Sequence, residues 1–120
     1  MSQSSSDDEG IPVKLTQNLK GLLRASIHVR GEEKEMPMSR LQILLHVASR
    51  SESGGALVRD LVKESGINQS SVARALSMLG AAQMDGLIEQ VPDPEDPRRV
   101  RVHLTRRGES FLSGVSNVMG

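Results

Sequence analysis

The sequence contains no cysteine and only one aromatic residue, Phe111, among its 120 residues. Without cysteine the chain has no disulfide, no thiolate metal ligand and no cysteine nucleophile, and its composition suits a reducing compartment. Without further aromatic side chains it lacks the stacking surfaces on which single-stranded nucleic acids bind, which argues against that class of protein. Aliphatic side chains must therefore fill the core.

Long apolar runs are missing as well. No stretch approaches the roughly 18 consecutive apolar residues that a membrane-spanning helix requires. The N-terminal segment MSQSSSDDEG has neither the basic start nor the apolar middle of a signal peptide. We therefore expect a cytoplasmic protein with no membrane partner.

Residue patterns typical of enzymes and metal sites are also absent from the sequence. His28, His46 and His103 are scattered, and none is paired with acidic residues at the spacing of a helical zinc site. The sequence has no glycine-rich phosphate loop and no nucleophile elbow. We predict that the protein is not an enzyme and that it uses no metal or cofactor.

Charge is balanced overall but unevenly placed. There are 15 basic and 15 acidic residues, so the formal net charge is zero. Three of the acids lie within residues 1–12, which we predict to be a disordered, acidic and serine-rich tail before a single domain over residues 13–120. Five arginines gather between residues 98 and 107, and such clustering is typical of a surface that binds a polyanion. A solvated strand and loop is the alternative interpretation.

An amphipathic helix is predicted at the start of the domain, from Val13 to about His28. Its apolar residues recur at helical spacing and contain more leucine than one small core requires. Residues 13–29 are therefore a candidate dimerisation helix, and a monomer that buries the same residues internally is the alternative. We call these residues the leucine stripe: Leu15, Leu19, Leu22, Leu23 and Ile27.

Residues 56–84 have the pattern of a helix-turn-helix. Gly66 can adopt the left-handed conformation that ends one helix, and Asn68 can cap the next. The second helix has one apolar face, and its opposite face is small and polar, with one arginine able to reach a guanine in the major groove. An ordinary surface helix would also fit. The apolar face comprises Val72, Ala75, Leu76 and Leu79, and the opposite face comprises Ser70, Arg74, Ser77 and Ala81.

A β-hairpin is predicted directly after these helices, over residues 87–104. Residues 99–104 alternate cationic and apolar side chains, and a proline-rich tip joins the two strands. The fold class is therefore mainly α with a small β-hairpin, a winged helix-turn-helix in which the hairpin is the wing. We expect Asp96 to hold Arg98 through hydrogen bonds. We also expect the wing tip and the second helix to face the same side of the molecule.

These segments resemble the MarR family of winged-helix regulators. The clearest match is Asp93-Pro94-Glu95-Asp96-Pro97-Arg98, followed at the family's spacing by Leu104-Thr105 and Gly108. Asn68-Gln69-Ser70-Ser71-Val72 looks like the start of the family's recognition helix. The resemblance covers about 70 residues of the sequence.

The resemblance implies a transcriptional regulator, acting as a repressor, that binds double-stranded DNA as a homodimer. It also implies a nucleoid-associated protein of bacterial, phage or plasmid origin. Two departures stand out: about three additional residues lie between Val72 and Gly86, and only about a dozen follow Gly108, where the family continues with dimerisation helices. No small-molecule effector is therefore predicted. Asp93 and Asp96 are expected to stabilise the wing. The residues expected at DNA are Asn68, Gln69, Ser70, Ser71, Arg74, Ser77, Arg98, Arg99 and Arg101.

Two other functions stay open at this point. A winged-helix adaptor or antirepressor, which binds a protein instead of DNA, would fit the zero net charge and the short C-terminal segment. A plasmid or phage protein that controls replication or partition would use the same DNA-binding surface as the regulator.

Overall fold

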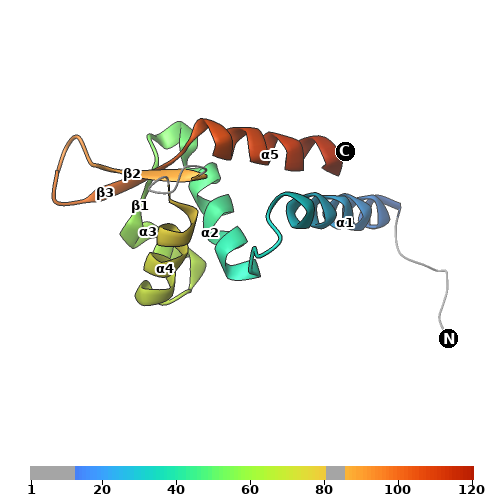
Figure 1. Ribbon diagram of the computed structural model, residues 1–120, viewed down its shortest axis with the longest axis horizontal. Coiled ribbons are helices and arrows are strands. Elements are labelled where there is room, and N and C mark those ends of the chain that lie inside the picture. Colours follow the sequence, from blue (N-terminus) through green and yellow to red (C-terminus); the bar gives the residue numbers. More distant parts are fainter. Residues whose placement is uncertain (1–12, 81–85) are drawn as a thin grey trace. The chain divides into compact units, whose positions relative to one another are not determined.

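The computed structural model describes residues 13–80 and 86–120. The predicted tail over residues 1–12 and the last part of the predicted helix-turn-helix, including Ala81, lie outside the described residues. The chain divides into two compact units, one formed by α1 with residues 113–120 and the other by residues 35–112. In the described residues the elements are α1 (Val13–Glu32), α2 (Met38–Ser49), η1 (Ser51–Ser53), β1 (Ala56–Leu57), α3 (Val58–Ser65), α4 (Gln69–Leu79), β2 (Ile88–Pro92), β3 (Val100–Leu104) and α5 (Arg106–Met119). Figure 1 labels the α-helices and the strands.

The first unit pairs α1 with the C-terminal half of α5. The two helices approach closely through small residues, because a Cβ on Gly21 would lie 2.8 Å from the carbonyl oxygen of Met119. Arg24 donates from Nε to the Val118 carbonyl oxygen (2.5 Å) and from Nη2 to that of Met119 (3.0 Å). The guanidinium thus satisfies carbonyls that the end of a helix leaves without intrahelical partners.

The leucine stripe lies outside this contact. α1 buries Gly21, Ala25 and Val29 instead. The five residues of the stripe are each 45–62% exposed, so the structure does not show the alternative in which a monomer buries them. In the part of the chain that the structure describes, no helix is long and apolar enough to cross a membrane.

The second unit has α2 at its centre. Ile43, Leu44 and Val47 of this helix are fully buried, and α2 contacts α3, α4 and β3. Each aliphatic side chain that leaves water here contributes roughly 1.5–3 kcal/mol. The core formed in this way holds α4 and the sheet against one common helix. Its other fully buried aliphatic side chains are Leu61, Val72, Ile88 and Val102.

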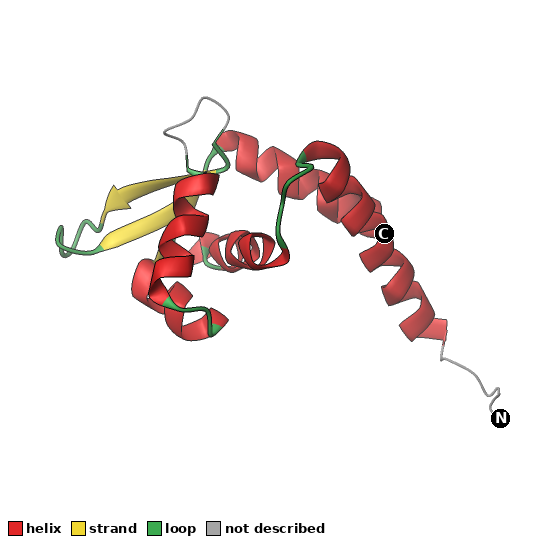
Figure 2. Ribbon diagram, turned by 60° about the horizontal axis from the view of Figure 1, so that its bottom comes forward, coloured by secondary structure: helices red, strands yellow, loops and turns green. Residues whose placement is uncertain are grey.

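The predicted hairpin is confirmed, but the sheet has one more strand than the sequence analysis predicts. β2 and β3 pair antiparallel, with Gln90 opposite Val102, and they extend away from the helices of their unit (Figure 2). Ala56 and Leu57, which the sequence pattern assigns to the helix-turn-helix, form β1 on the other side of β3, and α3 begins only at Val58. Two residues are too few to show the alternation by which strands are recognised.

The C-terminal helix α5 runs for 14 residues although it contains two glycines, Gly108 and Gly114. Gly114 lies against the imidazole of His28, where a Cβ would be 2.6 Å from Nε2. Tertiary packing here overrides the low helix propensity of glycine.

Candidate nucleic-acid interface

The turn between α3 and α4 forms as the sequence predicts. Gly66 has φ of 71° and its N–H donates to the Val62 carbonyl oxygen, which ends α3 in the left-handed conformation. The Oδ1 atom of Asn68 accepts hydrogen bonds from the Ser71 N–H (2.8 Å) and from the Ser70 hydroxyl (2.9 Å). This cap satisfies an N–H that the first turn of α4 would otherwise leave unpaired. The start and direction of α4 are therefore set by local contacts.

Helix α4 has the two faces expected of it. Val72, Ala75, Leu76 and Leu79 are buried, and the predicted outer residues Ser70, Arg74 and Ser77 are exposed. Two further residues of this helix, Ala73 and the half-exposed Met78, also reach solvent, although neither belongs to the predicted outer face. The exposed surface of α4 therefore consists mainly of short, uncharged side chains, and Arg74 is its one long cation.

A buried carboxylate organises the wing. Asp93 is only 1% exposed, and its Oδ2 lies 2.8 Å from Nη2 of Arg99 while its Oδ1 accepts from Nε of Arg101 (3.1 Å). Arg101 also donates from Nη1 to the carbonyl oxygen of Gly55 (3.2 Å), which joins the wing to the segment before β1. A DNA contact by Arg101 stays a prediction, because its guanidinium already donates to Asp93 and Gly55 and its side chain is mostly buried.

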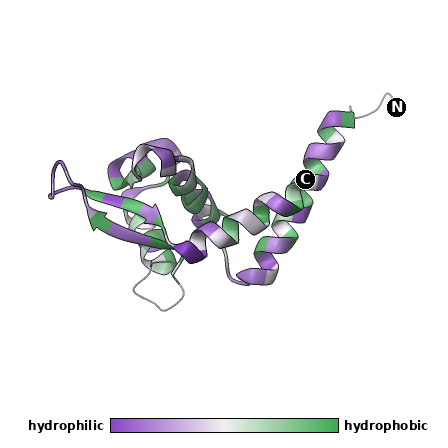
Figure 3. Cartoon of the chain, turned by 90° about the horizontal axis from the view of Figure 1, so that it is seen from above, coloured by the Kyte–Doolittle hydropathy of each residue, from purple (hydrophilic) through white to green (hydrophobic). Residues whose placement is uncertain are grey.

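The second acid of the wing holds the tip arginine, as expected. Asp96 accepts from Nε and Nη2 of Arg98 (3.1 and 3.3 Å) and from the Arg98 N–H (3.2 Å). The Arg98 side chain is nevertheless 89% exposed, against 32% for Arg99 and 22% for Arg101. Figure 3 shows the loop between the strands as hydrophilic. Arg98 is therefore the wing cation that is both ordered and open to a partner.

The same contacts shift the acidity of both carboxyl groups. Burial raises the pKa of Asp93, but hydrogen bonds from Arg101 and from the Glu95 amide, with the charges of Arg101 and Arg99, outweigh burial and leave it below its ordinary value. The pKa of Asp96 is also lowered, first by the hydrogen bonds from the side chain and amide of Arg98. Both acids are consequently ionised at neutral pH.

We expect the wing to lose these ion pairs only in acid. Because each folded-state pKa lies below the ordinary value of 3.8, ionised Asp93 and Asp96 stabilise the fold above that pH. This contribution disappears as the pH falls through the lowered folded-state values, and at about pH 5–8 it is constant. A carbon-13 NMR titration measures both carboxyl groups, with Asp93→Asn and Asp96→Asn assigning the signals. A midpoint above 3.8 for either group would contradict the expectation.

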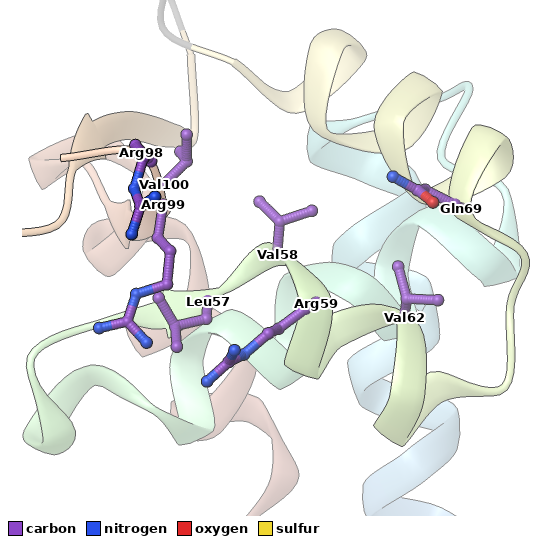
Figure 4. A pocket seen from close by; sticks show the side chains of 8 residues that line it. All are labelled: Leu57, Val58, Arg59, Val62, Gln69, Arg98, Arg99 and Val100. Atoms are coloured by element: carbon purple, nitrogen blue, oxygen red, sulfur yellow. The ribbon is translucent and has the colours of Figure 1, made fainter. Parts of the chain in front are cut away.

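Helix α4 and the wing border one surface hollow of about 410 Å³. Gln69, the first residue of α4, lies on one side and Arg98 and Arg99 lie on the other, as Figure 4 shows. The floor between them is apolar, and Arg59 of α3 adds a further cation that the sequence analysis misses. The first residue of α4 and the wing tip therefore border the same hollow. The common orientation of the outer face of α4 and the wing tip stays a prediction. Its apolar residues are Leu57, Val58, Val62 and Val100.

Known proteins share this architecture. RV1404 from Mycobacterium tuberculosis superposes with a TM-score of 0.69 at 18% identity, over 88% of this chain and 67% of that chain. A MepR variant from S. aureus bound to an oligodeoxyribonucleotide gives 0.67 at 17% identity, over 88% of this chain and 72% of that one. A MarR variant from E. coli complexed with operator DNA gives 0.62 at 18% identity, over 90% and 69%. At such identities the likeness establishes the fold.

No curated protein matches the chain. The sequence does, however, match a family model. Residues 28–108 match the model of the winged helix DNA-binding domain, and this range includes α2, the helix-turn-helix and the whole wing. Because the match spans more than half of the sequence, the chain belongs to the family of winged helix DNA-binding domains, and its fold is MarR-like.

Proposed function

We propose that this protein is a sequence-specific regulator of transcription, acting as a repressor and not as an enzyme, that binds double-stranded DNA. The observation that carries the proposal is the hollow that Gln69 and Arg98 both line. Because α4 and the wing tip border the same hollow, one partner can contact both. The MepR and MarR variants with the same fold, solved with an oligodeoxyribonucleotide and with operator DNA, support the choice of that partner.

In this proposal α4 reads bases in the major groove. The small side chains of Ser70 and Ser77 allow the helix to approach the floor of the groove, and their hydroxyls can bind phosphates or base edges. Arg74 is exposed between them and is long enough to donate two hydrogen bonds to one guanine. Arg74 is therefore the main source of base selection that we propose.

The wing supplies a contact with the backbone or the minor groove. The wing carries three arginines but four acids, so its formal charge is −1 and its long-range attraction for DNA is weak. These residues are Arg98, Arg99, Arg101, Glu89, Asp93, Glu95 and Asp96. The arrangement compensates for this, because Asp93 is buried while Arg98 projects outward. Asp96 orders the Arg98 side chain before DNA arrives, which lowers the entropy lost on docking.

A homodimer is the assembly that we propose for this function. The leucine stripe on α1 is exposed along its length, and the helix that carries it already uses its small-residue face to contact α5. A second copy of the same stripe would remove these aliphatic side chains from water. The two DNA-binding surfaces would then address two half-sites related by a two-fold axis.

Selection of bound duplexes from a random pool tests both parts of the proposal. We expect the purified protein to enrich a palindrome whose half-site centres lie about 10 base pairs apart, or a multiple of that. Leu22→Glu should reduce sedimentation to that of a monomer and weaken binding to the full palindrome more than to one half-site.

A pool with no enriched sequence would rule out a sequence-specific regulator. Partners that remain bound to the protein after nuclease treatment would in that case favour the adaptor alternative. The double variant Arg74→Ala/Arg98→Ala serves as the control, because both side chains are exposed and their loss should abolish enrichment without unfolding the protein.

A further inference from the structure

A second hollow lies beside α4, formed with the start of α2. It measures about 250 Å³ and is lined by residues from both helices. Unlike the hollow next to the wing, it is mainly polar, with two hydroxyl side chains and two guanidinium groups around it. Its lining residues are Pro37, Ser39, Arg40, Ser71, Arg74 and Ala75.

The two hollows lie on opposite flanks of the recognition helix. An α-helix turns about 100° per residue, so Gln69 and Ser71 project about 100° to either side of the outward-facing Ser70. Gln69 lines the hollow beside the wing, and Ser71 lines the hollow beside α2. The outer face of α4 therefore has one cationic depression on each side.

Each depression contains an arginine that the fold does not use to neutralise an acid. Within residues 13–80 and 86–120, neither Arg59 nor Arg40 forms an ion pair with a carboxylate. Arg59 is exposed. Arg40 donates one hydrogen bond, from Nη1 to the carbonyl oxygen of Glu35 (3.2 Å). The remaining N–H groups of both side chains are open to an anionic partner.

Duplex DNA has a matching arrangement of charge. Two sugar–phosphate backbones border the major groove, one from each strand. If α4 lies in that groove and the wing reaches the adjacent minor groove, the backbone between the grooves must cross the space between α4 and the wing tip. That space is the first hollow, whose apolar floor suits deoxyribose carbon atoms and whose arginines suit phosphate.

We propose that the two hollows hold the two backbones that border the major groove, with Arg59 contacting a phosphate of one strand and Arg40 a phosphate of the other. This inference rests on the proposed function, and it assigns DNA contacts to two residues outside the set predicted from the sequence. Arg59 and Arg40 then fix the depth and tilt of α4, while Arg74 reads the base. Because phosphates are the same in every sequence, both contacts add affinity without base preference.

The test uses the selected duplex with single phosphates replaced by neutral methylphosphonates, one strand at a time. Each substitution is measured with the parent protein, Arg59→Ala and Arg40→Ala. We expect each variant to be insensitive to one neutral phosphate that weakens the parent, and the two phosphates to lie on opposite strands. Each variant should also release about one counterion fewer on binding than the parent does. Between 50 and 200 mM salt, its affinity should therefore fall by a factor about three times smaller than that of the parent.

Lys20→Ala provides the matched control for loss of one charge. Lys20 is exposed on α1 and lines neither hollow, so this variant should respond to every methylphosphonate as the parent does. The inference is overturned if the parent binds the duplex but no phosphate couples to either arginine, or if both couple to one strand. A parent with no affinity for any duplex would overturn the proposed function as well, so the two failures are distinguishable.

Discussion

Replacing Arg74 by alanine is expected to weaken binding to the cognate duplex by about 1–3 kcal/mol, or roughly 5- to 160-fold, and to relax selection at one base pair. Arg74 is exposed on the outer face of α4, between small side chains that allow the helix to enter the groove deeply. A guanidinium that donates two parallel hydrogen bonds to guanine loses both when that guanine is replaced. The energetic preference for guanine therefore disappears together with the side chain.

Binding to duplexes that carry each of the four base pairs at every position measures this effect. The parent should discriminate at the position that Arg74 reads, and Arg74→Ala should bind all four duplexes with similar affinity there. Arg98→Ala is the informative comparison, because a backbone or minor-groove contact should lower affinity broadly and reduce the salt slope by about one. If both variants match the parent on every duplex, neither residue contacts DNA as proposed.

The second large effect is a loss of stability that we expect from Gly108→Ala. Gly108 is buried in the first turn of α5, and a Cβ at this position would overlap the carbonyl oxygen of Leu87 and lie 3.0 Å from its carbonyl carbon. That carbonyl cannot shift freely, because its oxygen accepts from the Thr105 N–H (3.0 Å) and the Leu87 N–H donates to Leu79 (2.8 Å). The clash should therefore cost about 1–3 kcal/mol or more of the free energy of unfolding.

Gly31→Ala is the matched control for this substitution. Gly31 also lies in a helix, α1, but a Cβ there would have no atom within 4 Å. Alanine should stabilise that helix by up to about 1 kcal/mol, since glycine is the poorer helix former. Urea unfolding of the two variants and the parent measures both changes. Equal midpoints for Gly108→Ala and the parent would show that the junction between Leu87 and α5 can adjust.

Several features of the interface follow from short stretches of sequence. Gly66 and Asn68 shape the turn through a backbone conformation and a cap that involve only neighbouring residues. The apolar periodicity of α4 predicts which residues turn outward, and the closeness of Asp96 to Arg98 predicts their hydrogen bonds. Such features are predictable because the interacting groups lie within a few residues of one another.

Other features need the folded chain. The contact from Arg101 to Gly55 joins positions 46 residues apart, and β1 exists only because β3 offers it a partner. In the sequence Arg59 is indistinguishable from any surface arginine of an amphipathic helix. Only the fold shows that it lines the same hollow as the wing arginines. The exposure of the leucine stripe was likewise undecided, since its apolar pattern is the same whether a core or a second chain covers it.

The local pattern of residues alone thus determined the turn, the outer face of α4 and the ordered arginine at the wing tip. The tertiary structure alone decided which arginines are occupied by Asp93, which remain open, and that two hollows flank α4. The physical reason is that hydrogen bonds between near neighbours are encoded in spacing. Burial and the pairing of distant charges depend on which elements the core brings together.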